Sequence, residues 1–190
     1  LAIVGLALGS WIGGDLISWA LKNIAVRSKY PMTVFSCGNQ HQEIIEIIAK
    51  ARHLPKQVLI FVCPSAIGHL FMAATQMNVK LPFLRMRFAV LGEPFTEKMR
   101  MDIDNICGLE FPRVSMVSAY GSADTGIIGM ESIPSIALRR LMFFSQVCRQ
   151  ALGVTGAPPN LYHISARDAF IEIVNKELVF TRWQGMPLVR

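Results

Sequence analysis

The chain has 190 residues, of which 52% are hydrophobic and 17% are charged, and its formal net charge is +6. This length supplies the core of one domain and is too short for two of ordinary size. The basic residues are scattered except for the pair Arg139-Arg140, and none of them forms a run interleaved with aromatic residues. This pattern favours ordinary solvated charge over nucleic-acid binding. It is still compatible with a modest attraction for an anionic ligand.

The cysteines form no C-x-x-C pair and lie in apolar contexts, which favours buried, reduced thiols in a cytosolic protein over disulfides or zinc ligands. They are Cys37, Cys63, Cys107 and Cys148. The four histidines lack metal-ligand spacing in the sequence, which favours surface or hydrogen-bonded positions. The apolar start of the chain is too short to cross a membrane and has no basic leader, so no membrane partner is predicted. The abrupt ends at Leu1 and Arg190 lead us to expect a fragment of a longer protein.

A glycine-rich apolar segment opens the chain, with Trp11-Ile12-Gly13-Gly14 at its centre. The double glycine indicates either a tight turn or a close approach by a ligand or another backbone. A short strand over Thr33–Phe35 and a helix ending near Ala51 are predicted next, because isoleucines recur on one helical face between residues 44 and 48.

The middle of the chain alternates between predicted strands and helices, which predicts a parallel sheet with helices on its faces. The strands are Val58–Val62, Arg87–Leu91 and Val114–Ala119; the helices are Pro64–Met77, capped by Ser65, and Glu97–Cys107, capped by Thr96 with Gly108 at its end. Ligands of such sheets bind outside the carboxyl ends of the strands. Two loops follow strands in this way, Gly92-Glu93-Pro94 and the segment from Tyr120 to Asp124.

The second of these loops is rich in small residues and ends in a carboxylate. Its backbone N–H groups can face a phosphate, and Asp124 can hold a magnesium ion. Three plainer interpretations remain beside this one. Asp124 can be the N-cap of a short helix, Tyr120 can belong to the core, and Glu93 can be a solvated turn residue.

Beyond this loop the pattern changes from strand–helix alternation to antiparallel strands. A helix is predicted over Ala137–Leu152, a loop over Gly153–Asn160, and a β-hairpin over Phe170–Val174 and Glu177–Thr181 with the turn Asn175-Lys176. We therefore predict an α/β fold, with a mostly parallel sheet, flanking helices and a following antiparallel β-hairpin. Its parts are an α/β core over 1–132, a helical insertion or linker over 133–160 and a β-rich segment over 161–190.

Several blocks match known motifs in their family order. The first blocks are Trp11-Ile12-Gly13-Gly14, which is similar to a Gly-Gly segment beside an acid pocket, and Cys63-Pro64-Ser65, which is similar to a "TPS" strand end. The central blocks are Leu91–Arg100, which is similar to "GAEPWSEEMR", and Tyr120–Asp124, which is similar to "YGxTE". The last blocks are Gly129-Met130-Glu131, which is similar to a glycine-rich "ExC" stretch, and Asp168–Arg190, which is similar to the segment before "RYRTGD". With these blocks the chain resembles the phenylacetate–CoA ligase branch of the adenylate-forming (acyl-CoA synthetase) superfamily. The matches span nearly all of the chain except residues 133–160.

The resemblance implies that a carboxylic acid is activated with ATP and Mg²⁺ and passed to CoA or a carrier protein. It assigns nucleotide binding to Gly92, Glu93, Pro94, Ser118, Tyr120, Gly121 and Ser122, the catalytic and magnesium-binding role to Asp124, and the acid pocket to Trp11, Gly13, Gly14 and Ala119. In that assignment Tyr120 stacks on the adenine and Ser122 approaches the α-phosphate. The apolar character of the pocket favours an aromatic or otherwise apolar acid.

Two positions depart from the family pattern, since the family's threonine is Ala123 and its glutamate is Asp124. The upstream phosphate loop, the ribose-binding aspartate and the C-terminal catalytic lysine also have no counterpart in this chain. Three hypotheses follow: a longer cytosolic ligase of which the isolated chain is an inactive part, a non-catalytic nucleotide- or carboxylate-binding protein on the same fold, or a structural fragment. The oligomeric state stays open, with a homodimer as one option.

Overall fold

The computed structural model describes residues 1–10, 12–51, 53, 56–122, 125–165 and 169–182. The helices are α1 (Ile12–Arg27), α2 (His41–Ala51), α3 (Pro64–Gln76), the 3₁₀ turn η1 (Phe83–Arg85), α4 (Glu97–Ile106), α5 (Ile133–Phe144) and α6 (Gln146–Ala151). The strands are β1 (Ala2–Gly5), β2 (Val34–Ser36), β3 (Val58–Val62), β4 (Met86–Val90), β5 (Met116–Ser122), β6 (Gly126–Met130), β7 (His163–Ile164), β8 (Ala169–Val174) and β9 (Glu177–Arg182).

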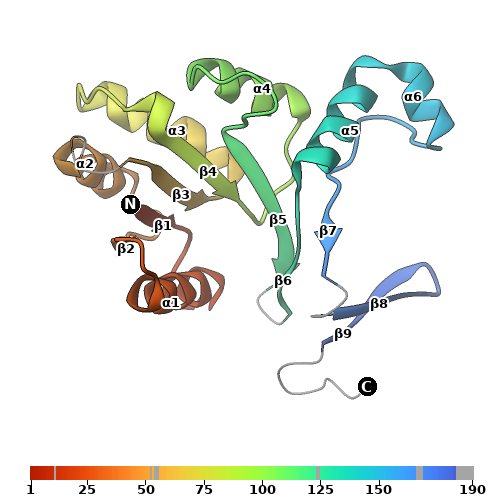
Figure 1. The fold of residues 1–190 in the computed structure, drawn as a ribbon, viewed down its shortest axis with the longest axis horizontal. Coiled ribbons are helices and arrows are strands. Elements are labelled where there is room, and N and C mark those ends of the chain that lie inside the picture. The colour runs from red at the N-terminus through yellow and green to blue at the C-terminus, as the bar shows by residue number, and fades with distance from the viewer. Residues whose placement is uncertain (11, 52, 54–55, 123–124, 166–168, 183–190) are drawn as a thin grey trace.

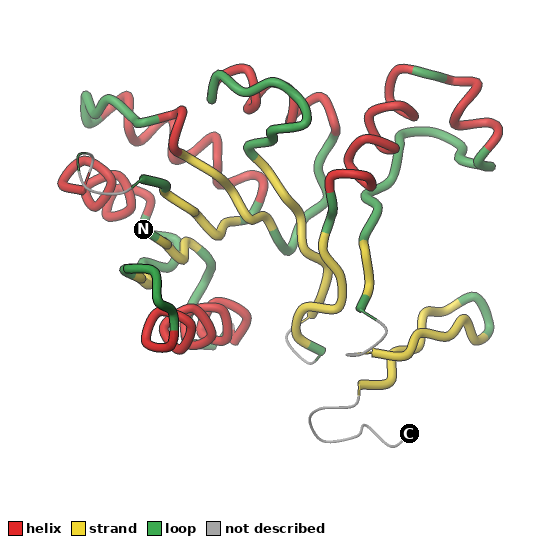
Figure 2. Tube along the Cα trace, in the orientation of Figure 1, coloured by secondary structure: helices red, strands yellow, loops and turns green. Residues whose placement is uncertain are grey.

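Among these described residues, seven strands form one sheet in the order β2-β1-β3-β4-β5-β6-β7 (Figure 1). The five strands from β2 to β5 are parallel, and β6 and β7 continue the sheet in antiparallel fashion. Figure 2 shows β5, β6 and β7 side by side at the end of the sheet away from α1. With the separate hairpin β8–β9, this arrangement confirms the predicted α/β fold.

The core lies between the sheet and the three helices α2, α3 and α4, which cover one face (Figure 1). Alternate residues of paired strands point into it, as the burial of Ile60 and Phe88 shows. On the opposite face, α1 lies against β1 and β2. The residues that β3, β4 and β5 turn toward that face, such as Phe61, Ala89 and Val117, are only half-buried.

Two helix starts illustrate how local chemistry sets the boundaries. Thr96 caps α4 as predicted, since its Oγ1 accepts a hydrogen bond from the Met99 N–H at 3.2 Å. The predicted cap of α3 was wrong. The helix begins at Pro64 as predicted, but its N-cap is Cys63, two residues before Ser65, because proline needs no N–H partner in the first turn.

The single helix predicted over 137–152 is two helices that meet at Ser145. Ser145 has an extended backbone (φ −120°, ψ 108°), and its hydroxyl accepts the Cys148 N–H at 3.1 Å, which starts α6. Arg149 Nη1 donates to the carbonyl of Met142 at 2.6 Å and thereby satisfies the end of α5. A serine in an otherwise apolar pattern therefore breaks the helix through its own hydrogen bond.

The predicted hairpin is present with its predicted turn. Asn175 and Lys176 have φ values of +52° and +68°, the left-handed pair that a two-residue type I′ turn requires. None of the described helices is long and apolar enough to cross a bilayer.

Candidate functional site

The loops predicted to bind nucleotide share one edge of the sheet. β3, β4 and β5 are parallel neighbours, so the segments after their carboxyl ends lie next to one another. Val90 pairs with Ser118, and β5 then continues for four residues past the end of β4. The loop over 92–94 and the strand end over 120–122 therefore lie at the same edge of the sheet, as the sequence predicts.

Glu93 joins two of these strand ends. Its Oε2 accepts a hydrogen bond from the Ser65 N–H at 3.1 Å, in the first turn of α3, where a carboxylate is favoured by the helix dipole. Gly92, at φ +85°, makes the turn that brings Glu93 there. Burial raises the pKa of the neighbouring Cys63 thiol, and the charge of Glu93 adds to this effect. Residues 92–94 are themselves exposed, so the loop is open to a ligand.

Ser118 is buried, and its hydroxyl, its N–H and its carbonyl oxygen all have partners within the protein. Its Oγ lies 3.1 Å from the Tyr162 Oη, and its N–H donates to Glu131 Oε2 at 2.8 Å. Asn160 Nδ2 in turn donates to the Tyr162 Oη at 2.9 Å. Sequence reasoning did not find Tyr162 or Asn160, because Asn160 ends the segment that matches no family block and Tyr162 lies two residues after it, outside the quoted blocks.

Tyr120 is 42% exposed, so its alternative interpretation as a core residue was wrong. Its ring centre lies 5.4 Å from that of Tyr162, with 30° between the planes, and 6.3 Å from that of Phe180 on β9. These three rings form an aromatic cluster above the end of β5. Part of the surface predicted to stack on adenine is therefore covered by Tyr162, and the rest is open.

Gly121 and Ser122 lie where β5 turns into β6. A Cβ on Gly121 would lie 2.1 Å from the Gly126 carbonyl oxygen, so only glycine fits beside this bulge. Ser122 Oγ and Thr125 Oγ1 are hydrogen-bonded at 2.8 Å. Ala123 and Asp124 lie outside the described residues, and the magnesium and N-cap interpretations of Asp124 stay predictions.

The residues predicted for the acid pocket are spread along the edge. Gly13 and Gly14 form the first turn of α1, so the tight-turn interpretation was wrong. A Cβ on Gly14 would lie 2.3 Å from the Ala7 carbonyl oxygen, which confirms a close approach by another backbone. Ala119 is buried on β5, which β3 and β4 separate from β1. Trp11 lies outside the described residues.

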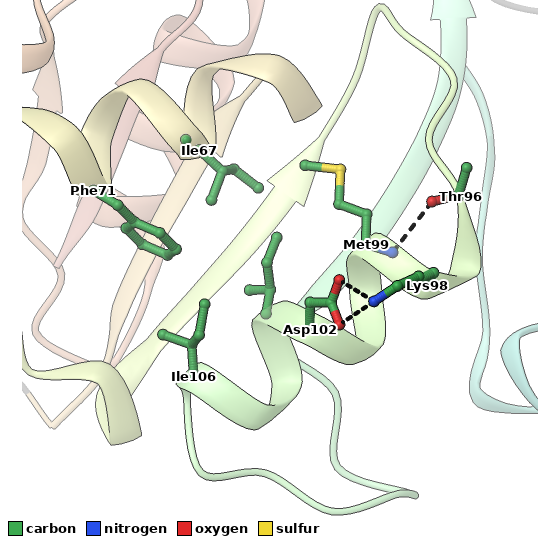
Figure 3. A pocket seen from close by; sticks show the side chains of 9 residues that line it. Ile67, Phe71, Thr96, Lys98, Met99, Asp102 and Ile106 are labelled. Carbon is green, nitrogen blue, oxygen red and sulfur yellow. Dashed lines mark hydrogen bonds and ion pairs between the residues drawn. The ribbon is translucent and has the colours of Figure 1, made fainter.

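Two pockets lie on the face of the sheet that α2, α3 and α4 cover, and none of the predicted site residues lines them. The first, of about 300 Å³, lies between α3 and α4, with Ile67 and Phe71 on one wall and Met99 on the other (Figure 3). Lys98 donates to both carboxylate oxygens of Asp102 at its rim, at 2.9 Å each. The second, of about 450 Å³, lies between α2 and α3.

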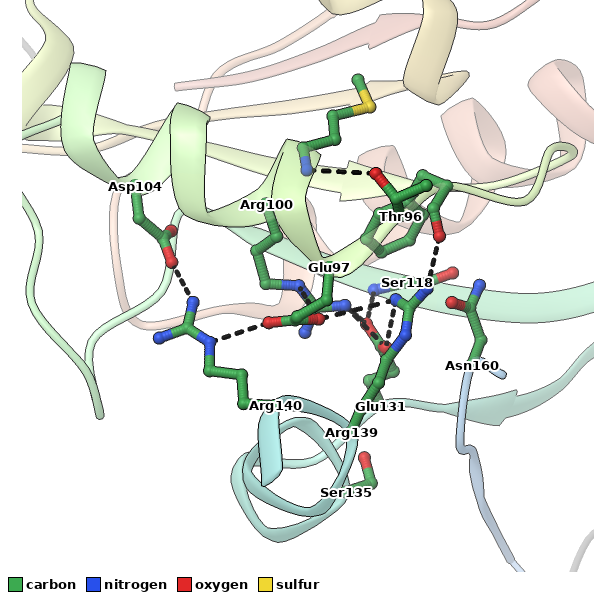
Figure 4. A network of polar contacts seen from close by, with 12 residues as sticks. Thr96, Glu97, Arg100, Asp104, Ser118, Glu131, Ser135, Arg139, Arg140 and Asn160 are labelled. Carbon is green, nitrogen blue, oxygen red and sulfur yellow. Dashed lines mark hydrogen bonds and ion pairs between the residues drawn. The ribbon is translucent and has the colours of Figure 1, made fainter. Parts of the chain in front are cut away.

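The main feature that sequence reasoning missed is a buried ionic cluster between α4, β5, β6 and α5 (Figure 4). It consists of three carboxylates and three guanidinium groups: Glu97, Asp104, Glu131, Arg100, Arg139 and Arg140. Arg100 Nη2 donates to both carboxylate oxygens of Glu131, at 2.7 and 2.8 Å. The interpretation of Arg139-Arg140 as solvated charge was wrong, since Arg139 is only 2% exposed.

An aromatic ring completes the cluster. The Phe95 ring lies close to two guanidinium groups, 5.0 Å from that of Arg100 and 4.7 Å from that of Arg139, and the Phe95 backbone carbonyl accepts a hydrogen bond from Arg139. Burial lowers the pKa of Arg139, and the nearby Arg100 lowers it further. Burial also lowers the pKa of Arg140, but its hydrogen bonds to Glu97 and Asp104 outweigh this and raise it.

The cluster reaches the candidate site through Glu131, which accepts from both Arg100 and the Ser118 N–H. It therefore fixes the strand end that carries Ser118 and Tyr120. The sequence signal was the spacing of Glu97, Arg100 and Asp104, which places three charges on one face of α4.

The four cysteines are free, and Cys37 and Cys107 are buried, with burial raising the pKa of each thiol to about 11. Within the described ranges, no group of three or more His, Cys, Asp or Glu side chains is placed to hold a metal ion. No model of a known protein family matches this chain, and no curated protein matches it. The family resemblance thus rests on the sequence blocks themselves.

Proposed function

We propose that this chain forms the nucleotide-binding part of a ligase that activates an aromatic or otherwise apolar carboxylic acid as an acyl-adenylate. The acyl group then passes to CoA or another thiol. One observation carries the proposal: three blocks that resemble the ligase motifs lie at the carboxyl ends of three neighbouring parallel strands, on one edge of the sheet. They are Cys63-Pro64-Ser65, Gly92-Glu93-Pro94 and Tyr120-Gly121-Ser122.

The contacts at this edge are compatible with a nucleotide. The exposed part of the Tyr120 ring offers a flat surface to a base, and the exposed loop over 92–94 follows the neighbouring strand at the same edge of the sheet. The hydroxyls of Ser122 and Thr125, at the open end of β5, are of the type that donates to phosphate oxygens.

In the proposed reaction, a carboxylate oxygen of the acid attacks the α-phosphorus of ATP. The bond between that phosphorus and its bridging oxygen breaks, and pyrophosphate leaves. Mg²⁺, when bound, would neutralise charge on the phosphates, and the resemblance assigns its binding to Asp124. Glu93 is a described carboxylate at this edge, and it already accepts the Ser65 N–H. It is therefore better suited to positioning the loop over 92–94 than to binding the metal ion.

A second candidate is a non-catalytic protein that binds a nucleotide or a carboxylate on the same fold. Two observations favour it. Ala123 stands where the family has a phosphate-binding threonine, and the Ser118 Oγ is already paired with Tyr162.

We also propose a cytosolic location, since free thiols persist in a reducing compartment. Small molecules are the proposed ligands in either case, with no nucleic acid as partner.

Two measurements test the proposal. The first is binding of a fluorescent ATP analogue to the chain, compared with Tyr120→Ala and with Tyr120→Phe as the matched control, which keeps the ring. Binding that Tyr120→Ala weakens and Tyr120→Phe retains supports a nucleotide site at this edge. Unchanged binding in both variants contradicts it.

The second measurement is ATP–pyrophosphate exchange by the complete gene product across aromatic and aliphatic carboxylic acids. Exchange that depends on an acid supports the ligase. Nucleotide binding without exchange for any acid favours the non-catalytic protein.

A further inference from the structure

We propose that His41 and His69 form a binding site for a zinc ion in the pocket between α2 and α3. His41 is the first residue of α2 and His69 lies in α3, and their ring centres are 5.4 Å apart although 28 positions separate them in the sequence. This inference is independent of the proposed nucleotide site, because the pocket contains none of that site's residues.

The separation of the two rings matches joint ligation of one ion. Zinc binds imidazole nitrogen at about 2.0–2.1 Å and prefers tetrahedral geometry. With roughly 1.1 Å from each nitrogen to its ring centre, each centre lies about 3.2 Å from the ion, and the tetrahedral angle separates the two centres by about 5.2 Å. The observed 5.4 Å lies within a few tenths of an ångström of that value.

The surroundings suit a partly hydrated cation. The pocket has a volume of about 450 Å³, and the amide side chains of Asn39, Gln40, Gln42 and Gln76 line it together with both histidines. Amide oxygens and waters can complete the coordination that two imidazoles begin. The space is ample, since a water molecule takes about 30 Å³ of liquid volume.

The protonation state also suits ligation, which requires a neutral imidazole. Burial lowers the pKa of His41, and the neighbouring His69 lowers it further. Both effects favour the neutral form of His41.

The ion would join α2 to α3, two helices that already pack against each other over the sheet. Because the two histidines come together only in the folded protein, zinc would bind the native state and raise the melting temperature by mass action. With two protein nitrogens and open positions, the site would bind zinc more weakly than a closed four-ligand site.

The test is a titration of the metal-free chain with Zn²⁺, followed by calorimetry and by thermal unfolding, with Co²⁺ as a spectroscopic probe. We expect saturable binding of one ion and a rise in melting temperature that grows with Zn²⁺ concentration. Either His41→Ala or His69→Ala abolishes both effects, whereas His163→Ala, which removes an exposed histidine on β7, leaves both unchanged.

His69→Gln provides a second variant if either alanine variant fails to fold, since the exposed His69 tolerates a polar replacement. The absence of saturable binding in the unmodified chain would overturn the proposal. Binding that survives in a folded His69 variant, or a cobalt spectrum with thiolate charge-transfer bands, would also overturn it.

Discussion

Two neighbouring regions of the sheet bury side chains of opposite character. Beneath α2 and α3 the buried residues are apolar, with Ile60 and Phe88 in the centre. Between α4 and α5 the buried residues include Arg100 and Glu131, joined at 2.7 Å. Apolar packing has no direction and tolerates small changes, whereas a buried charge needs a partner at hydrogen-bond distance. The two regions should therefore respond very differently to conservative substitution.

The largest expected effect is that of Glu131→Gln, which keeps the side chain's shape and removes its charge. Arg100 and Arg139 then lose a carboxylate in a site without solvent, and we expect a loss of about 3–5 kcal/mol in the free energy of unfolding. Urea unfolding measures this loss. A change below about 1 kcal/mol would show that stability is no more sensitive to conservative substitution in the cluster than in the apolar core.

Thr96→Ala tests the start of α4, the helix that carries half of the cluster's charges. It removes the acceptor of the Met99 N–H, and we expect a loss of about 0.5–2 kcal/mol by the same unfolding assay. Thr96→Ser is the matched control, since it keeps the oxygen, and it should lose much less. Equal losses in both variants would mean that the methyl group, and not the cap, matters.

Ile60→Val tests the apolar region with a change as conservative as Glu131→Gln. Removing one methyl group from this fully buried side chain should cost about 0.5–1.5 kcal/mol. A loss as large as that of Glu131→Gln would remove the contrast between the two regions.

Lys98→Ala should have the smallest effect. Lys98 pairs with Asp102 on the outer face of α4, where both side chains are more than half exposed. Exposed pairs of this spacing contribute about 0.3–0.5 kcal/mol, and 0.5 M salt should reduce that contribution. A larger loss that persists in salt would indicate that Lys98 does more than form this pair.

The apolar region could be predicted from the sequence almost residue by residue. The bounds of β3, Val58–Val62, are those predicted, because a continuous apolar run between turns has few other solutions in an α/β chain. The β8–β9 hairpin was also predictable, since Asn175-Lys176 separates two alternating segments by two residues.

The ionic region could not be predicted in this way. Arg139 and Arg140 look like surface residues because their partners, Phe95 and Glu97, lie 44 and 43 positions earlier. Similarly, the sequence predicted the meeting of the loops at the strand ends, but not that Tyr162 would cover part of Tyr120. Local sequence patterns predict individual helices and strands. Contacts between side chains that are far apart in the sequence leave no such local pattern.

The distance in sequence between the partners of the ionic cluster also sets the order in which they leave the ribosome. Glu131 leaves the ribosome 31 residues after Arg100, and Arg140 leaves it 43 residues after Glu97. At roughly 5–20 residues per second, these gaps correspond to about 2–9 s. During that time β1 to β4 can already assemble, while the charges of α4 still lack their partners Glu131, Arg139 and Arg140. Translation speed through residues 101–140 therefore sets how long Glu97 and Arg100 wait for their partners Arg140 and Glu131.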